Sequence, residues 1–153
     1  MTDIRKFMNI INESDALVAT PSLPKFNDLD GFTKGYFEAM LWTDEEDLKN
    51  DGADVNYHNI DPEDAAKQIA DCERFKTEGA ALLQQAWDQH HMSDESAGHD
   101  FWLTRNGHGA GFWDRDLDSD AGGKKLGDAL TALCKKFGEV WTYVGDDKLI
   151  HIS

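Results

Sequence analysis

The sequence predicts a single α+β domain in which an antiparallel sheet of two β-hairpins is covered on one face by helices. The 153 residues are the usual length of one domain and can bury a core without disulfide bonds. Apolar residues make up 40% of the chain and recur at helical spacing over its first two thirds. Two later segments have the pattern of hairpins. We therefore expect residues 28–153 to form the domain, and residues 1–27 a short helix and a linker.

The helical part divides into three expected segments. Residues 3–13 have apolar side chains at helical spacing and end before two prolines. A second helix begins near Asp28 or Asp30, either of which can cap it. A third, long helix begins at Asp61, which precedes a proline and acids suited to a first turn, and runs to about His91.

The remaining segments predict hairpin, helix and hairpin. Residues 101–114 reverse direction at Gly107 between two aromatic runs, which is typical of a hairpin. Residues 126–137 carry an apolar helical stripe that Gly138 closes as a left-handed cap. Residues 140–152 form the second hairpin. We expect the aromatic residues on these predicted strands to lie in the sheet core, with at most one ring left exposed as an anchor for a partner: Trp102, Trp113, Trp141 and Tyr143.

The charge balance restricts the kinds of partner. Thirty acidic residues against fifteen basic ones give a net charge of −15, and the basic residues are scattered. We therefore expect no direct binding of nucleic acid and no binding to membranes. The acids concentrate between Asp44 and Asp64, where there are nine acidic residues and one basic residue, Lys49. Solubility is one explanation of this charge. The other is a partner protein with a basic surface, bound by Asp44, Glu45, Glu46, Asp47, Asp51, Asp54, Asp61, Glu63, Asp64, Asp71 and Glu78.

The two cysteines indicate a reducing compartment. Cys72 and Cys134 lie far apart within helical patterns, so we expect free thiols. No apolar stretch is long enough for a signal peptide or a membrane span. The expected location is the cytoplasm, which is the host cytoplasm for a phage-encoded protein.

The first predicted hairpin offers an alternative site. Folding back would bring His99 and Asp100 near Asp114, and such a group could bind a divalent metal or transfer protons. However, His108 would lie at the turn, far from His99, and Arg105 and Arg115 can pair with neighbouring aspartates. We therefore predict no metal site, no catalytic residue and no cofactor.

The segment GHDFWLTRNGHGAGFWDR, residues 98–115, and the later residues 143–147 (YVGDD) resemble a group of small acidic proteins from tailed phages and prophages. The resemblance covers most of residues 28–150. It implies a phage origin and no mechanism, because that group has no assigned activity.

A phage origin favours a non-enzymatic protein that inhibits or modulates a host nucleic-acid-handling or defence protein, with its acidic surface as a DNA mimic. Two alternatives stay open. One is a metal-dependent or acid–base enzyme centred on the first hairpin, and the other is a structural or assembly protein of the virion. The oligomeric state is not predicted.

Overall fold

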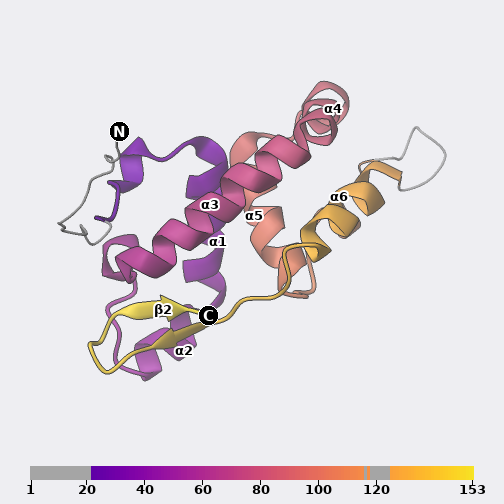
Figure 1. Cartoon of the computed structure of the whole chain (residues 1–153). Helices are drawn as coiled ribbons and strands as arrows, with labels where there is room; N and C mark the ends of the chain where they lie inside the picture. The colour runs from indigo at the N-terminus through magenta and orange to yellow at the C-terminus, as the bar shows by residue number, and fades with distance from the viewer. Residues whose placement is uncertain (1–21, 116, 118–124) are drawn as a thin grey trace, which may run out of the picture.

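The computed structural model describes residues 22–115, 117 and 125–153. These residues form six α-helices and one antiparallel sheet of two strands (Figure 1). The predicted fold class is therefore wrong, because the described chain is mainly helical and has one hairpin where two were expected. The helix predicted for residues 3–13 lies outside the described residues.

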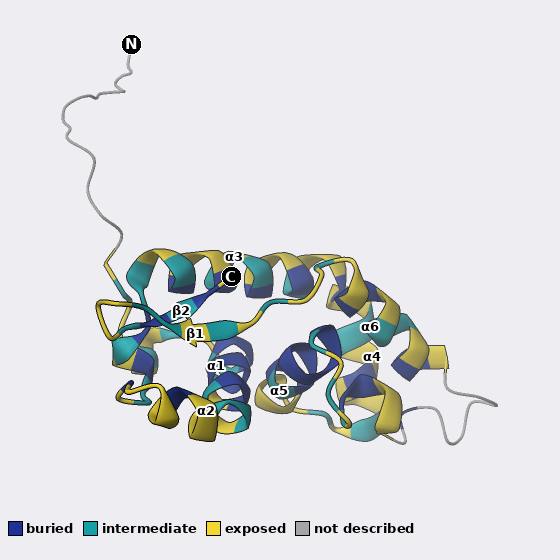
Figure 2. Cartoon of the chain, turned by 90° about the horizontal axis from the view of Figure 1, so that it is seen from below, coloured by how far each residue is buried: buried dark blue, intermediate teal, exposed yellow. Residues whose placement is uncertain are grey.

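The elements surround a core formed by the two central helices. Figure 2 shows the buried faces of α1 and α5 in the middle, with α3 along one side. Helices α4 and α6 lie at one end of the molecule, and α2 and the hairpin lie at the other (Figures 1 and 2). The bounds are α1 (Gly31–Thr43), α2 (Glu45–Asn50), α3 (Pro62–Glu78), α4 (Ala80–His90), α5 (Asp94–Arg105), α6 (Lys125–Lys135), β1 (Thr142–Val144) and β2 (Ile150–Ile152).

Several helix ends match the sequence prediction. Asp30 caps α1 by accepting a hydrogen bond from the Thr33 N–H at 2.8 Å. Asp61 caps α3 in the same way, with the Asp64 N–H at 3.0 Å. After α6, Gly138 adopts the predicted left-handed conformation, with a φ of 75°. Each cap satisfies backbone groups that have no partner inside the helix.

The long helix predicted from Asp61 to His91 is divided. Helix α3 ends at Glu78 and α4 begins at Ala80, with Gly79 between them. A Cβ atom on Gly79 would lie 2.7 Å from Cδ2 of Leu133 in α6. Gly79 therefore lets α6 approach closely where α3 meets α4.

The first predicted hairpin is wrong because its leading half belongs to α5. Ser93 caps this helix by accepting a hydrogen bond from the Ser96 N–H at 3.2 Å, and two acids occupy its first turn. Most of the helix is buried around its whole circumference, so its apolar run lacks a helical period and is easily read as a strand. The buried residues of α5 are Ala97, Gly98, Asp100, Phe101, Trp102, Leu103, Thr104 and Arg105.

The second predicted hairpin is confirmed. Strands β1 and β2 pair antiparallel, with Tyr143 opposite His151. On its other side β2 forms a parallel bridge with Ile60, and the Asp61 N–H donates to the Ile150 carbonyl at 2.8 Å. These contacts hold the hairpin against the first turn of α3. Among the described residues, no helix combines the length and the apolar composition needed to cross a bilayer.

Candidate functional site

The residues of the alternative site predicted on the first hairpin lie on α5 and in the turns after it. His99 lies on α5 with its Nε2 3.7 Å from Oε1 of Glu38. His108 follows the end of α5, where its N–H donates to the Leu103 carbonyl. Asp114 accepts a hydrogen bond from the Gly111 N–H at 3.0 Å in the next turn. The hairpin end that was expected to gather these side chains is absent from the described chain, but His99 and Asp114 both lie near enough to Asp100 for their charges to act on it. His108 takes no part in this group, because its described contact is with the end of α5.

Asp100 is buried on α5 and forms an ion pair with Arg115. The guanidinium donates two hydrogen bonds to the carboxylate, at 2.9 and 2.7 Å. Burial raises the pKa of Asp100, and the hydrogen bonds from Arg115 offset only part of that effect. The pair fastens the chain after α5 to the helix, because leaving Asp100 unpaired in the interior would be costly.

Arg105 is also structural. Its side chain is 2% exposed. It donates to the carbonyl oxygens of Gly138 and Phe137 at 2.8 and 2.9 Å, to the Tyr36 hydroxyl at 2.9 Å and to Asp71 at 3.0 Å. These contacts join α5 to α1, to α3 and to the segment after α6. Asp71 is therefore occupied inside the molecule and is not a free member of the predicted acidic surface.

Several other acids of the predicted partner surface also have partners in the fold. Asp44 accepts a hydrogen bond from the Thr142 hydroxyl at 2.7 Å, which ties the start of α2 to β1. Asp61 caps α3, and Asp64 contacts His151 and the Ile152 N–H. Glu78 pairs with Arg74 at 3.0 Å. The predicted surface is thus smaller than the sequence suggested.

The exposed remainder forms what we call the acidic face, consisting of Glu45, Glu46, Asp47, Asp51 and Asp54 on and just after α2. Lys49 neutralises part of it through an ion pair with Glu45 at 2.7 Å. The other four carboxylates form no ion pair with any residue in the described part of the chain. Glu63 is exposed as well, on the first turn of α3.

Two exposed tryptophans flank the acidic face. Trp42 at the end of α1 is 72% exposed, and Trp141 before β1 is 62% exposed. Each lies within two residues of the hydrogen bond between Asp44 and Thr142. The expectation of a sheet core is wrong for three of the four aromatic residues, because Trp113, Trp141 and Tyr143 are all exposed. Sequence reasoning overlooked Trp42, although its position off the apolar stripe of α1 predicts exposure.

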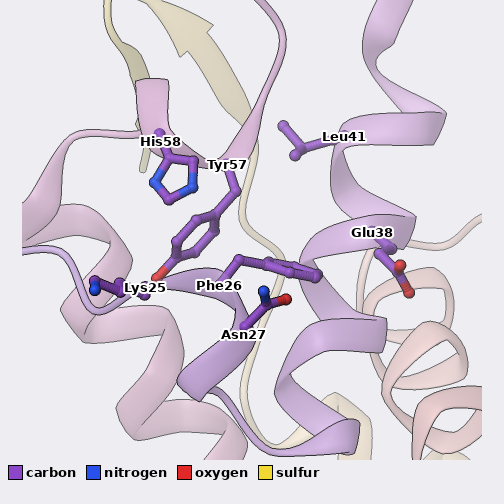
Figure 3. Close-up of a pocket in the computed structure, with 7 residues that line it drawn as sticks. All are labelled: Lys25, Phe26, Asn27, Glu38, Leu41, Tyr57 and His58. Carbon is purple, nitrogen blue, oxygen red and sulfur yellow. The ribbon is translucent and has the colours of Figure 1, made fainter.

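A mainly apolar pocket of about 650 Å³ lies beside α1 (Figure 3). The ring of Phe26 packs edge-on against Tyr57 at 5.4 Å between centroids, and the Tyr57 hydroxyl donates to the Pro24 carbonyl at 2.7 Å. The charged groups of Lys25 and Glu38 come from opposite sides and do not converge on one point (Figure 3). The lining residues are Lys25, Phe26, Asn27, Glu38, Leu41, Tyr57 and His58.

A histidine lies among carboxylates where the hairpin meets α3. Nδ1 of His151 is 3.1 Å from Asp64, and Nε2 is 3.0 Å from Asp147. Partial burial lowers the pKa of His151, but the hydrogen bonds and charges of Asp147 and Asp64 outweigh it, so the pKa is raised. Asp61, Asp147 and His151 together have the donor atoms that a metal ion could use. The alternation of side chains along β2 predicts that His151 points away from the core. Nothing in the sequence indicates that it contacts Asp64 of α3.

A scan against protein-family models and searches of curated proteins and of solved structures gave no match to this chain.

Proposed function

We propose that this is a non-enzymatic binding protein whose acidic face engages a basic surface on another protein. The observation that carries the proposal is the concentration of Glu46, Asp47, Asp51 and Asp54 on one short exposed segment without basic partners among the described residues. Carboxylates that are not neutralised internally remain available to steer and orient a cationic partner.

The flanking tryptophans favour binding over solubility alone. A charged surface that serves only solubility has no use for large exposed rings, whereas protein interfaces are enriched in tryptophan at their centres and carry charge at their rims. Trp42 is the most exposed of the large hydrophobic side chains described. It precedes the acidic face directly in the chain, so one partner could contact both.

The resemblance of residues 98–115 to phage proteins supports a bacterial host protein as the partner, and a nucleic-acid-handling or defence protein has the basic groove that this charge would fit. DNA mimicry requires carboxylates spaced along an extended surface. The acidic face is one short helix and the turns after it. We therefore propose that it contacts a single basic patch on the partner, which requires no extended imitation of a DNA duplex.

The test compares two triple variants with the same change in net charge. One carries Glu46→Gln, Asp47→Asn and Asp51→Asn on the acidic face, and the control carries Asp128→Asn, Glu139→Gln and Asp146→Asn elsewhere on the surface. Each tagged protein is used to capture partners from a bacterial lysate at low and raised salt. Any retained protein is then purified, and its affinity for each variant is measured by calorimetry.

We expect the wild type and the control to bind the same basic protein, and the acidic-face variant to lose most of that affinity. Raised salt should weaken binding, because the screening length falls from about 10 Å at 0.1 M to about 3 Å at 1 M. Equal affinity of the two triple variants, or the absence of any salt-sensitive partner, would show that the acidic face is not a binding surface.

A further inference from the structure

The junction between α3 and the hairpin brings together a second group of acids that the proposed partner contact does not use. Asp61 and Asp64 come from the start of α3, Asp147 from the hairpin turn, and His151 from β2. Among the described residues, no lysine or arginine forms an ion pair with any of the three carboxylates. Three negative charges therefore surround one imidazole.

The donor atoms lie close to the separation that a metal ion requires. One ligand atom each from Asp61, Asp147 and His151 lies within 4.8 Å of the other two. A tetrahedral zinc site with bonds of about 2.0–2.2 Å places its ligand atoms about 3.3–3.6 Å apart. The pair formed by Asp147 and Nε2 of His151 is already at 3.0 Å. A modest approach of Asp61 would complete a three-ligand set.

The histidine is oriented for this role before any ion binds. Asp64 accepts from Nδ1 of His151 and is itself fixed by the Ile152 N–H at 3.0 Å. This leaves Nε2 facing Asp147. Metal-bound histidines usually donate their other ring N–H to such a carboxylate, which fixes the ring and its tautomer. The Tyr143 ring stacks on the imidazole at 5.3 Å, with planes 19° apart, and restricts it further.

We propose that Asp61, Asp147 and His151 bind one divalent transition-metal ion, with Asp64 as the positioning residue. One nitrogen and two carboxylate oxygens suit Zn²⁺, and three protein ligands leave a position open to water. Asp147 is 49% exposed, so an ion can enter from solvent. The start of α3 carries about half a positive charge, which the three carboxylates outweigh.

Bound metal would link two segments that are distant in the sequence. Asp61 precedes α3, whereas Asp147 and His151 belong to the C-terminal hairpin. An ion held by both segments binds the folded arrangement better than the unfolded chain, so it stabilises the docked hairpin by mass action.

The test is a calorimetric titration of the untagged protein with ZnCl₂ at pH 8. Thermal unfolding is measured in parallel, with and without zinc. His151→Gln and Asp147→Asn remove ligands, and Asp64→Asn removes the positioning carboxylate. All six histidines lie in the described residues. His90 and His91 are adjacent in the sequence, and a His90→Gln, His91→Gln double variant serves as the control for zinc bound by this pair.

We expect one ion per chain at micromolar affinity and a raised unfolding temperature. Affinity should fall about tenfold to a hundredfold in Asp64→Asn and further in the two ligand variants, with the control unchanged. Circular dichroism confirms folding of each variant, and Asp147→Asn, in an exposed turn, decides the result if His151→Gln is unfolded. Zinc affinity that is unchanged in Asp147→Asn, lost in the control, or undetectable in the wild type overturns the proposal.

Discussion

Gly98 of α5 lies directly against the carbonyl oxygen of Phe32 in α1, so that a Cβ atom at residue 98 would stand 1.9 Å from that oxygen. Gly35 makes the reciprocal contact, where a Cβ atom would lie 2.1 Å from the Glu95 carbonyl oxygen. The two helices therefore meet backbone to backbone. A side chain at either position would force them apart and disturb the packing of the whole core.

Gly98→Ala should destabilise the protein by about 1–3 kcal/mol or more, because the added methyl group has no space in the packed interface. Chemical denaturation measures the free energy of unfolding. Gly109→Ala is the control, since a Cβ atom there has nothing within 4 Å. If both variants unfold at the same denaturant concentration, α1 and α5 do not meet backbone to backbone at Gly98.

Arg105→Met should cost about 3 kcal/mol, because Arg105 is buried and its loss leaves the partly buried Asp71 and two carbonyl groups without their donor. Lys49→Met, which breaks the exposed pair with Glu45, should cost less than about 1 kcal/mol. Both values come from equilibrium unfolding. Similar costs for the two substitutions would argue against the role of Arg105 in the interior.

Trp42 and Trp102 should differ sharply in their effect on stability. Trp102 is 1% exposed and donates from its ring to the Thr43 hydroxyl at 3.0 Å, so Trp102→Ala should cost about 3–5 kcal/mol. Trp42→Ala should change stability by about 0.5 kcal/mol or less, because the ring is 72% exposed. Loss of partner affinity in folded Trp42→Ala would support the proposed contact, and a large loss of stability would place this ring in the core instead.

Asp30 should stabilise the protein in a pH-dependent way. Partial burial raises its pKa, but hydrogen bonds from Lys76 and Thr33 outweigh burial, so the pKa lies below its ordinary value of 3.8. A lowered pKa in the folded state means that this stabilisation is complete above pH 3.8 and is lost as the pH falls through the folded pKa.

Asp30→Asn keeps a capping side chain but removes the charge. The wild type should therefore be more stable than this variant at pH 7, by about 1 kcal/mol or less, and the difference should shrink below pH 3.8. Asp28→Asn, at an exposed neighbouring position, is the control. A difference between wild type and Asp30→Asn that stays constant with pH would contradict the assignment.

The two thiols should be unreactive in the folded protein. Cys72 and Cys134 are both fully buried, and burial raises the pKa of each thiol. Iodoacetamide at pH 8 should modify neither cysteine in the native state and both in guanidinium chloride, as read by intact mass. Rapid modification of either cysteine in the native protein would show that its helix opens readily.

The sequence alone determined the parts of this protein that depend on neighbouring residues. Asp30 and Asp61 are caps because they precede helical apolar patterns, Gly138 ends a helix because it tolerates positive φ, and the alternation around residues 145–147 specifies a hairpin. These features follow from hydrogen bonding and backbone sterics within a few residues, so a local pattern suffices to predict them.

The helical state of α5 and the exposure of each acidic side chain depend instead on contacts between distant parts of the chain. The run from Phe101 to Leu103 fits a strand or a buried helix equally well, and it is a helix because glycines at residues 35 and 98 let α1 and α5 pack closely. In the same way, Asp64 and Asp71 are paired within the fold because His151 and Arg105, which are distant in the sequence, lie beside them. Such contacts between distant residues leave no local pattern, whereas Glu46 and Asp47 are exposed on α2, which buries Leu48 instead.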